Sequence, residues 1–269
     1  MIKKISNNNF TNKRLLIFDS GVGGLSIYLS ANVKFQNIDI HYLSDNEAFP
    51  YGNKSINFLT KRVLKVLKHA VDKINPDVLV IGCNTISTIL LDQLRNTLTI
   101  PIIGVVPAIK TAGLISETKD VALLATDGTV KSKYTEELIN KHSNNCNVFC
   151  FGASDLVSNI ESFINGAQLN QDLIRSIIVK IQQTSEMIDT VVLGCTHFPL
   201  IKEYLVENYR DLNWIDSTDA IISRIEQILS IKNSSEPNKT TIWYTQNIEK
   251  QYLKIFLKEN SFDEFIKLF

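Results

Sequence analysis

The stretch "DVLVIGCNTIST", residues 77–88, places a cysteine directly after an apolar run and a glycine, and residues 189–200, "DTVVLGCTHFPL", repeat the pattern. Both read Asp, four mostly apolar residues, Gly, Cys and then small polar residues. A short apolar run that ends in such a turn is typical of a parallel strand buried on both faces. We therefore expect Cys83 and Cys195 to follow two equivalent strand ends.

Two further apolar runs end in glycine-bearing turns, "RLLIFDSGVGGLS" at residues 14–26 and "VALLATDGTVKS" at residues 121–132. Between the runs lie amphipathic segments of helical length, such as residues 56–74 and 169–188. Strands that alternate with helices predict an α/β fold with doubly wound parallel sheets. In the segment 56–74, the residues expected on one buried face are Phe58, Val63, Leu67, Ala70 and Val71.

The order of the runs predicts two similar halves. Cys195 follows Cys83 by 112 residues, and Gly128 follows Gly21 by 107. These nearly equal offsets indicate two doubly wound parallel-sheet domains that face each other across a central cleft. The first would comprise residues 13–106 plus about 217–269, and the second residues 107–216. In this reading, "IPIIGVVPAIK" (100–110) crosses between the halves, and the tail 242–262 returns to the first after a polar linker, 231–241.

Composition and charge limit the class of protein. The chain has 269 residues, 44% hydrophobic and 21% charged, with 28 basic and 28 acidic residues and a net charge of +0. Without a large basic field, nucleic acid is not expected as a partner. The polar N-terminus has no signal-peptide core, and no run approaches the roughly 18 apolar residues of a membrane span. We expect a cytoplasmic protein with no membrane partner, in a compartment where thiols stay reduced.

The 4 cysteines are interpreted as free thiols, because they lack the paired spacing of zinc sites and the setting of a disulfide framework. No metal is expected. Cys146 and Cys150 are interpreted as two small buried hydrophobic residues. The turn "SGVGGLS" has Ser26 where a dinucleotide fingerprint needs its third glycine, so no nucleotide cofactor is expected. Its glycines are interpreted as letting backbone amides approach a small anion.

Two facing thiols suit one kind of chemistry. Ligands of parallel sheets bind beyond the carboxyl ends of the strands, so Cys83 and Cys195 are expected on opposite walls of one pocket. One thiol can then remove a proton from a carbon while the other returns a proton to the opposite face, because a thiol pKa of about 8.5 is within reach of neutrality. Asp19 and His197 are candidate helpers of the first and second thiol. Hydrogen-bond donors around a substrate carboxylate are expected from Asn84, Thr85, Thr196 and the backbone of these turns.

Five motifs in order, "FDSGVGGLS", "SDNEAFPYG", "GCNTIS", "ATDGTVKSKY" and "GCTHFPL", together resemble the glutamate racemases of the aspartate/glutamate racemase family. The match runs over residues 15–200, about two-thirds of the chain. The resemblance implies a cofactor-independent two-cysteine isomerase that interconverts L-glutamate and D-glutamate for peptidoglycan synthesis. It also implies a homodimer.

The resemblance carries site residues onto this sequence. It implies Cys83 and Cys195 as catalytic acid–base thiols, with Asp19, His197 and an acidic residue, Glu161. The implied substrate-binding residues are Asp19, Ser20, Pro50, Tyr51, Gly52, Asn84, Thr85, Thr126, Thr129, Thr196 and His197. The segment 151–162, "FGASDLVSNIES", lacks a proline that many members have here. It is similar to the enteric-type branch, in which UDP-N-acetylmuramoyl-L-alanine is an allosteric activator.

Three other readings remain open from the residues. An aspartate racemase would use the same chemistry on a shorter acid, but its second motif typically carries Glu where this chain has His197. A binding protein on the same scaffold would keep the cleft without the reaction. Strand-end packing alone could also place both cysteines. The presence of both thiols together with Asp19 and His197 favours the enzyme.

Overall fold

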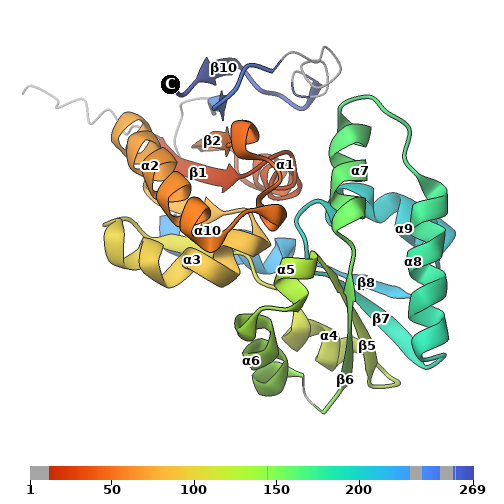
Figure 1. Ribbon diagram of the computed structural model, residues 1–269. Coiled ribbons are helices and arrows are strands. Elements are labelled where there is room, and N and C mark those ends of the chain that lie inside the picture. Colours follow the sequence, from red (N-terminus) through yellow and green to blue (C-terminus); the bar gives the residue numbers. More distant parts are fainter. Residues whose placement is uncertain (1–11, 144, 231–237, 249–256, 258) are drawn as a thin grey trace, which may run out of the picture.

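The computed structural model describes residues 12–143, 145–230, 238–248, 257 and 259–269 (Figure 1). It contains a six-stranded sheet with the order β10-β9-β2-β1-β3-β4 and a four-stranded sheet with the order β6-β5-β7-β8. Every pair of neighbouring strands is parallel. The predicted α/β class with two parallel sheets is therefore confirmed. Most of the predicted linker, residues 231–237, and residues 249–256 of the tail lie outside the described residues.

The first sheet consists of β1 (Lys13–Asp19), β2 (Ile38–Ser44), β3 (Val78–Ile81), β4 (Ile102–Gly104), β9 (Thr240–Tyr244) and β10 (Glu264–Lys267). The second consists of β5 (Asp120–Ala125), β6 (Asn147–Gly152), β7 (Ile188–Leu193) and β8 (Asn213–Ile215). The order 2-1-3-4 in one half corresponds to 6-5-7-8 in the other. In both, the chain order reverses beside the first strand of the half, β1 or β5, and such a switch point opens a crevice at the strand ends.

Helices cover the sheets as the alternating pattern requires (Figure 1). The α-helices are α1 (Leu25–Lys34), α2 (Ile56–Ile74), α3 (Asn84–Thr97), α4 (Ile109–Ile115), α5 (Asp127–Val130), α6 (Lys133–His142), α7 (Ser154–Ile164), α8 (Gln171–Thr184), α9 (Lys202–Asn208) and α10 (Thr218–Leu229). Short 3₁₀ turns are η1 (Asn46–Ala48), η2 (Tyr51–Asn53) and η3 (Phe198–Ile201). Although α10 follows the second sheet in sequence, it contacts α1, β3 and β4 of the first half. The domain boundaries, 13–106 plus about 217–269 and 107–216, remain a prediction.

Strand β1 shows how the core is divided. Residues 15–18 are fully buried, and alternate side chains enter two different apolar clusters. Leu15 and Ile17 join the cluster that includes α1, and Leu16 and Phe18 join the one that includes α2 and α3. Side chains of a strand alternate between the faces of its sheet, so helices on both faces account for the continuous apolar run.

Helix α2 confirms the predicted helix but corrects its buried face. Ser55 caps its first turn by accepting a hydrogen bond from the amide of Phe58, and Asn75 ends it in the left-handed conformation with φ 50°. The buried residues are Leu59, Val63, Val66, Leu67, Ala70 and Ile74. Phe58 is 45% exposed, so the prediction that it is buried was wrong. It precedes Leu59 by one position and is rotated about 100° away from the buried stripe.

The prediction that Cys146 and Cys150 are both buried is wrong for Cys150. Cys146 is buried in the cluster around β5, whereas Cys150 is exposed. Cys150 lies on β6, an edge strand of the second sheet in which only Phe151 is buried. Four apolar-looking residues at an edge strand are thus not enough to predict burial on both faces.

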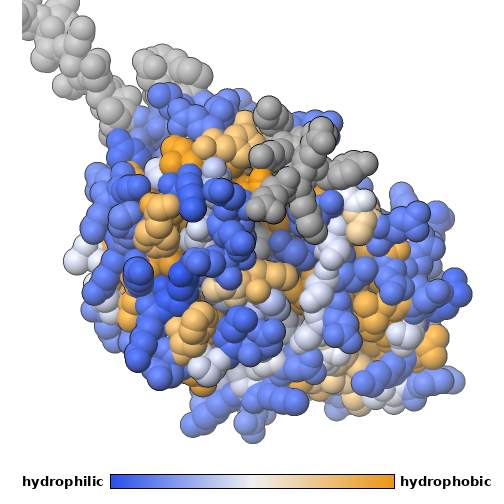
Figure 2. Space-filling model, turned by 45° about the horizontal axis from the view of Figure 1, so that its top comes forward, coloured by the Kyte–Doolittle hydropathy of each residue, from blue (hydrophilic) through white to orange (hydrophobic). Residues whose placement is uncertain are grey.

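Hydrophilic side chains dominate the face seen in Figure 2, and apolar residues appear there as separate patches. Among the described residues, no helix combines the length and the apolar character needed to cross a bilayer.

A glycine at the end of β7 provides a test of the packing at the strand ends. A Cβ on Gly194 would lie 2.7 Å from Leu123 Cδ1 and 3.1 Å from both Ala125 Cβ and the Leu124 carbonyl oxygen. We expect Gly194→Ala to lower the free energy of unfolding by about 1–3 kcal/mol, because overpacking shifts buried neighbours. Urea unfolding followed by circular dichroism measures this change.

Gly52→Ala is the matched control, because a Cβ there would meet nothing within 4 Å. It should leave stability unchanged or raise it by up to about 1 kcal/mol. Equal destabilisation by the two substitutions would contradict the packing described here.

Candidate active site

A cavity of about 380 Å³ opens where the carboxyl ends of β1, β3, β5 and β7 meet. Both cysteines that follow the repeated apolar runs line it, and so do residues from both halves. The predicted site residues in its lining are Asp19, Ser20, Pro50, Tyr51, Gly52, Cys83, Asn84, Thr85, Thr126, Cys195, Thr196 and His197. Two predicted residues, Thr129 and Glu161, lie behind the lining.

The same backbone contact explains the glycine that precedes each cysteine. The amide of Gly82 donates a hydrogen bond of 2.7 Å to the carbonyl of Phe18 on β1, and the amide of Gly194 donates one of 2.7 Å to the carbonyl of Leu124 on β5. A Cβ on Gly82 would lie 3.2 Å from the same Phe18 oxygen. Because the two strand ends lie so close together, the next residue, a cysteine, lies at the crevice between them.

A chain of polar contacts runs behind Cys195. Its Sγ lies 3.8 Å from His197 Nδ1, and His197 Nε2 lies 2.8 Å from Glu161 Oε2. Glu161 is carried by α7, so the acidic residue and the Cys195–His197 pair come from different elements of the second half. Burial opposes the charged imidazolium, but the hydrogen bonds with Cys195 and Glu161 outweigh it and raise the pKa of His197 well above its ordinary value. His197 is therefore positioned as a cation beside the thiol.

The glycine-rich turn after β1 packs directly against His197 and Glu161. A Cβ on Gly23 would lie 2.5 Å from His197 Nδ1, and one on Gly21 would lie 2.6 Å from Glu161 Oε2. The amide of Val22 donates a hydrogen bond of 3.0 Å to that same carboxylate oxygen. The glycines were interpreted as a way for amides to approach an anion, and the anion at Val22 is the protein's own Glu161.

The first thiol has a different environment. Asp19, at the end of β1, is 1% exposed and accepts hydrogen bonds from the Gly21 amide at 2.8 Å and from the Thr196 hydroxyl at 3.2 Å. Burial raises the pKa of Asp19 to about 6, against the lowering effect of His197 and the Gly21 amide. Burial, followed by the nearby Asp19 carboxylate, also raises the pKa of Cys83, which favours its protonated form. Among the hydrogen bonds of the described residues, none joins Asp19 directly to Cys83.

The two threonines after β5 act as a pair. Thr126 caps α5 by accepting a hydrogen bond from the amide of Thr129, and the two hydroxyl oxygens are 2.9 Å apart. Thr126 lines the cavity, whereas Thr129 is fully buried outside the lining. Thr129 is thus positioned to orient the Thr126 hydroxyl.

Comparison with known proteins identifies the family to which the chain belongs. The family model of the Asp/Glu/Hydantoin racemases matches residues 33–225 of the chain. The chain belongs to this racemase family.

Among individual relatives, the chain is 41% identical to the glutamate racemase of Shewanella frigidimarina over 255 residues, which cover 93% of this chain and 96% of the relative. It is 44% identical to that of Vibrio cholerae over 222 residues, 82% of each chain. The structure is similar to the crystal structure of Escherichia coli glutamate racemase in complex with L-glutamate and the activator UDP-MurNAc-ala. That likeness has a TM-score of 0.88 at 34% identity and covers 95% of this chain and 98% of the other.

Several lining residues of this racemase-family chain were not predicted. They are Phe49, Asn53, Asp127, Ser154, Asp155, Val157 and Ser158. Asp127 hydrogen-bonds to Ser154, which joins the turn after β5 to the start of α7. The pair Ser154 and Asp155 before an apolar run is a common helix start, and that signal could have placed the first turn of α7 at a strand end. Within the described residues, no group of three His, Cys, Asp or Glu side chains could hold a metal ion.

The buried carboxyl of Asp19 makes stability depend on pH. Its pKa of about 6 in the folded protein lies above the ordinary 3.8, so the folded state binds the proton more tightly than the unfolded chain. The resulting stabilisation is fully present below pH 3.8 and is lost as the pH rises through 6. We expect Asp19→Asn, which cannot ionise, to exceed the wild type in unfolding free energy by about 1–3 kcal/mol at pH 8. The advantage should shrink towards zero near pH 4.

Urea unfolding of both proteins at the two pH values checks this expectation. A difference that is the same at both pH values would show that Asp19 is not held with a raised pKa.

Proposed function

We propose that this chain is a glutamate racemase, which interconverts L-glutamate and D-glutamate and so supplies D-glutamate for peptidoglycan synthesis. The observation that carries the proposal is the placement of Cys83 and Cys195 at equivalent strand ends of two similar halves, lining one cavity. Relatives that cover nearly the whole chain at about 40% identity are glutamate racemases, which supports the choice of substrate.

In one direction, we propose that Cys195 removes the α-proton. The imidazolium of His197, itself held by Glu161, stabilises the thiolate that this step requires. Cys83 then gives its proton to the opposite face of the carbon. One proton leaves the substrate and another joins it, so the product has the inverted configuration and the cysteines have exchanged their protonation states.

In the other direction, Cys83 acts as the base. Its deprotonation is opposed by burial and by the charge of Asp19, so it requires somewhere for the proton to go. Asp19 has a pKa of about 6 and is therefore suited to take up and release a proton near neutral pH. We propose that this is the role of Asp19, while Cys195 is the acid.

The remaining lining residues would bind the substrate. The cavity lining contains neutral serine, threonine and asparagine side chains together with Asp19, Asp127 and Asp155, and its described residues include no lysine or arginine. Asn84 and Thr85 form the first turn of α3, where the helix dipole favours a carboxylate. The other proposed binding residues are Ser20, Pro50, Tyr51, Gly52, Thr126 (oriented by Thr129) and Thr196, together with Asp19 and His197.

Regulation and assembly are further parts of the proposal. UDP-N-acetylmuramoyl-L-alanine is the proposed activator, supported by the likeness to the E. coli enzyme crystallised with UDP-MurNAc-ala and by the proline-free segment 151–162. A homodimer is proposed from the resemblance. The cytoplasm is the proposed location, because a two-thiol reaction needs cysteines that stay reduced.

The direct test is circular dichroism of L-glutamate and, separately, L-aspartate incubated with the purified full chain under reducing conditions. Each would be measured with and without UDP-N-acetylmuramoyl-L-alanine. We expect decay of the L-glutamate signal alone, and a faster decay in the presence of the nucleotide. Decay with L-aspartate instead would assign the enzyme to the shorter acid. A flat trace from folded, reduced protein in every tube would indicate a binding role.

Substitution of either thiol should remove the reaction. We expect Cys83→Ser and Cys195→Ser each to lower racemisation by at least about a thousandfold, because a hydroxyl is a far weaker acid than a thiol. Cys150→Ser is the matched control, since Cys150 is exposed on an edge strand outside the cavity, and it should keep wild-type turnover. Near wild-type activity in either cavity variant would refute the two-thiol mechanism.

A further inference from the structure

The loop between β2 and α2 forms one wall of the cavity. Phe49, Pro50, Tyr51, Gly52 and Asn53 all line it. The loop has only the two short 3₁₀ turns η1 and η2 as regular structure. Contacts outside the cavity fix its position, most of them made by side chains.

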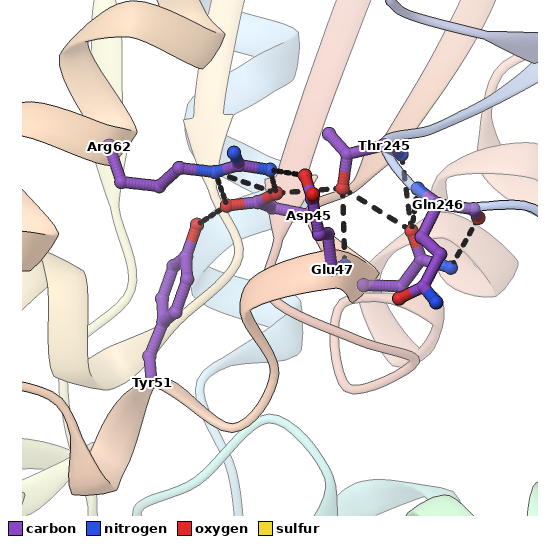
Figure 3. Close-up of polar contacts among 7 residues, drawn as sticks. Asp45, Glu47, Tyr51, Arg62, Thr245 and Gln246 are labelled. Atoms are coloured by element: carbon purple, nitrogen blue, oxygen red, sulfur yellow. Dashed lines mark hydrogen bonds and ion pairs between the residues drawn. The ribbon is translucent and has the colours of Figure 1, made fainter.

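Asp45 is the centre of those contacts (Figure 3). Its side chain is fully buried, and its carboxylate accepts hydrogen bonds from three elements. The hydroxyl of Tyr51 donates at 2.6 Å, Arg62 Nη2 on α2 donates at 2.6 Å, and the hydroxyl of Thr245, just after β9, donates at 2.7 Å. Arg62 Nε also donates, at 3.0 Å, so the guanidinium grips the carboxylate with two nitrogens.

A second layer ties the same loop to the end of β9. The Asn46 side chain accepts from the Thr245 amide at 3.1 Å and the Gln246 amide at 2.9 Å, and donates to the Gln246 carbonyl at 2.7 Å. The amide of Glu47 donates to the Thr245 hydroxyl at 3.2 Å, and the Glu47 carboxylate pairs with Arg62 at 2.6 Å. Residues about 200 positions apart in the chain thus meet beside the cavity wall.

Tyr51 connects this cluster to the cavity. Its side chain is almost fully buried and belongs to the same apolar cluster as Phe18 and Cys83. The rings of Tyr51 and Phe18 lie with centroids 6.3 Å apart. A buried hydroxyl needs a partner, and Asp45 supplies it. Packing on one side and the Asp45 carboxylate on the other therefore fix Tyr51 relative to Cys83.

Asp45, Arg62 and Thr245 are absent from the described cavity lining. They therefore act on a bound ligand indirectly, through the loop that they hold. The backbone adds to this connection, because the amide of Asp45 donates a hydrogen bond of 2.9 Å to the carbonyl of Asp19 at the end of β1.

We infer that Asp45 is a positioning residue, which together with Arg62 and Thr245 holds Tyr51 and the wall 49–53 in the geometry that binds glutamate. The choice of ligand rests on the proposed function. Loss of one hydrogen bond to Asp45 loosens the wall and weakens binding of both enantiomers, while the two thiols stay in place.

The test compares Thr245→Val with Thr241→Val. Thr241 lies on β9, four residues before Thr245 and away from the loop. We expect Thr245→Val to raise KM for both L-glutamate and D-glutamate about 3- to 10-fold, the range for one hydrogen bond, with kcat changed less than about twofold. Thr241→Val should leave KM unchanged. Asp45→Asn should raise KM by more than about tenfold, provided that circular dichroism shows the variant to be folded.

A purely structural role for Asp45 would lower the thermal midpoint and the amount of active enzyme without changing KM. An unchanged KM in folded Thr245→Val, or an equal increase in Thr241→Val, would overturn the inference. Calorimetric titration of L-glutamate into the same proteins separates this result from the proposed function. If the wild type binds glutamate but does not racemise it, the proposed function fails, and the dissociation constants of the variants still test the positioning role.

Discussion

The close contact between the ends of adjacent strands is the constraint on which the site depends. In the first half, the amide of Gly82 after β3 donates a hydrogen bond to the carbonyl of Phe18 on β1. In the second half, the amide of Gly194 after β7 donates one to the carbonyl of Leu124 on β5. The absence of a side chain at these glycines permits the approach, and the next residue is a cysteine. The two thiols are therefore placed by the backbone geometry of the strand ends.

The environments around the two thiols then differ through burial and charge. Cys195 has an imidazole and a carboxylate in line behind it, and Cys83 has a buried carboxyl with a raised pKa nearby. Taking Asp19, His197 and Glu161 out of water costs free energy. The contact between His197 and Glu161 and the hydrogen bonds that both carboxylates accept from the Gly21 and Val22 amides and the Thr196 hydroxyl offset part of it. The site thus has less stability than an apolar one would have, a pattern common where chemistry requires shifted pKa values.

Sequence reasoning was most successful where the signal is local. Apolar runs that end in glycine predicted the strands, and the recurrence of Cys83 and Cys195 after such runs predicted that they share a cavity. It was wrong where the partner of a residue is remote. Cys150 is exposed because β6 is an edge strand, and strand order is invisible in the run itself. The lining by the first turn of α7 and the link from Asp45 to Thr245 were not predicted, because they depend on segments brought together by the fold. Glu161, which contacts His197, was named from the family resemblance and not from a local pattern.

The near repetition of the two halves has a thermodynamic consequence for an enzyme that acts on both enantiomers. L- and D-glutamate have equal free energy in an achiral solvent, so their equilibrium constant is one. The ratio kcat/KM must then be the same in both directions, whatever the difference between the surroundings of Cys83 and Cys195. Asymmetry between Asp19 on one wall and His197 with Glu161 on the other can appear only as compensating changes in kcat and KM. Unequal walls can therefore set which enantiomer occupies the enzyme longer, but never which one accumulates.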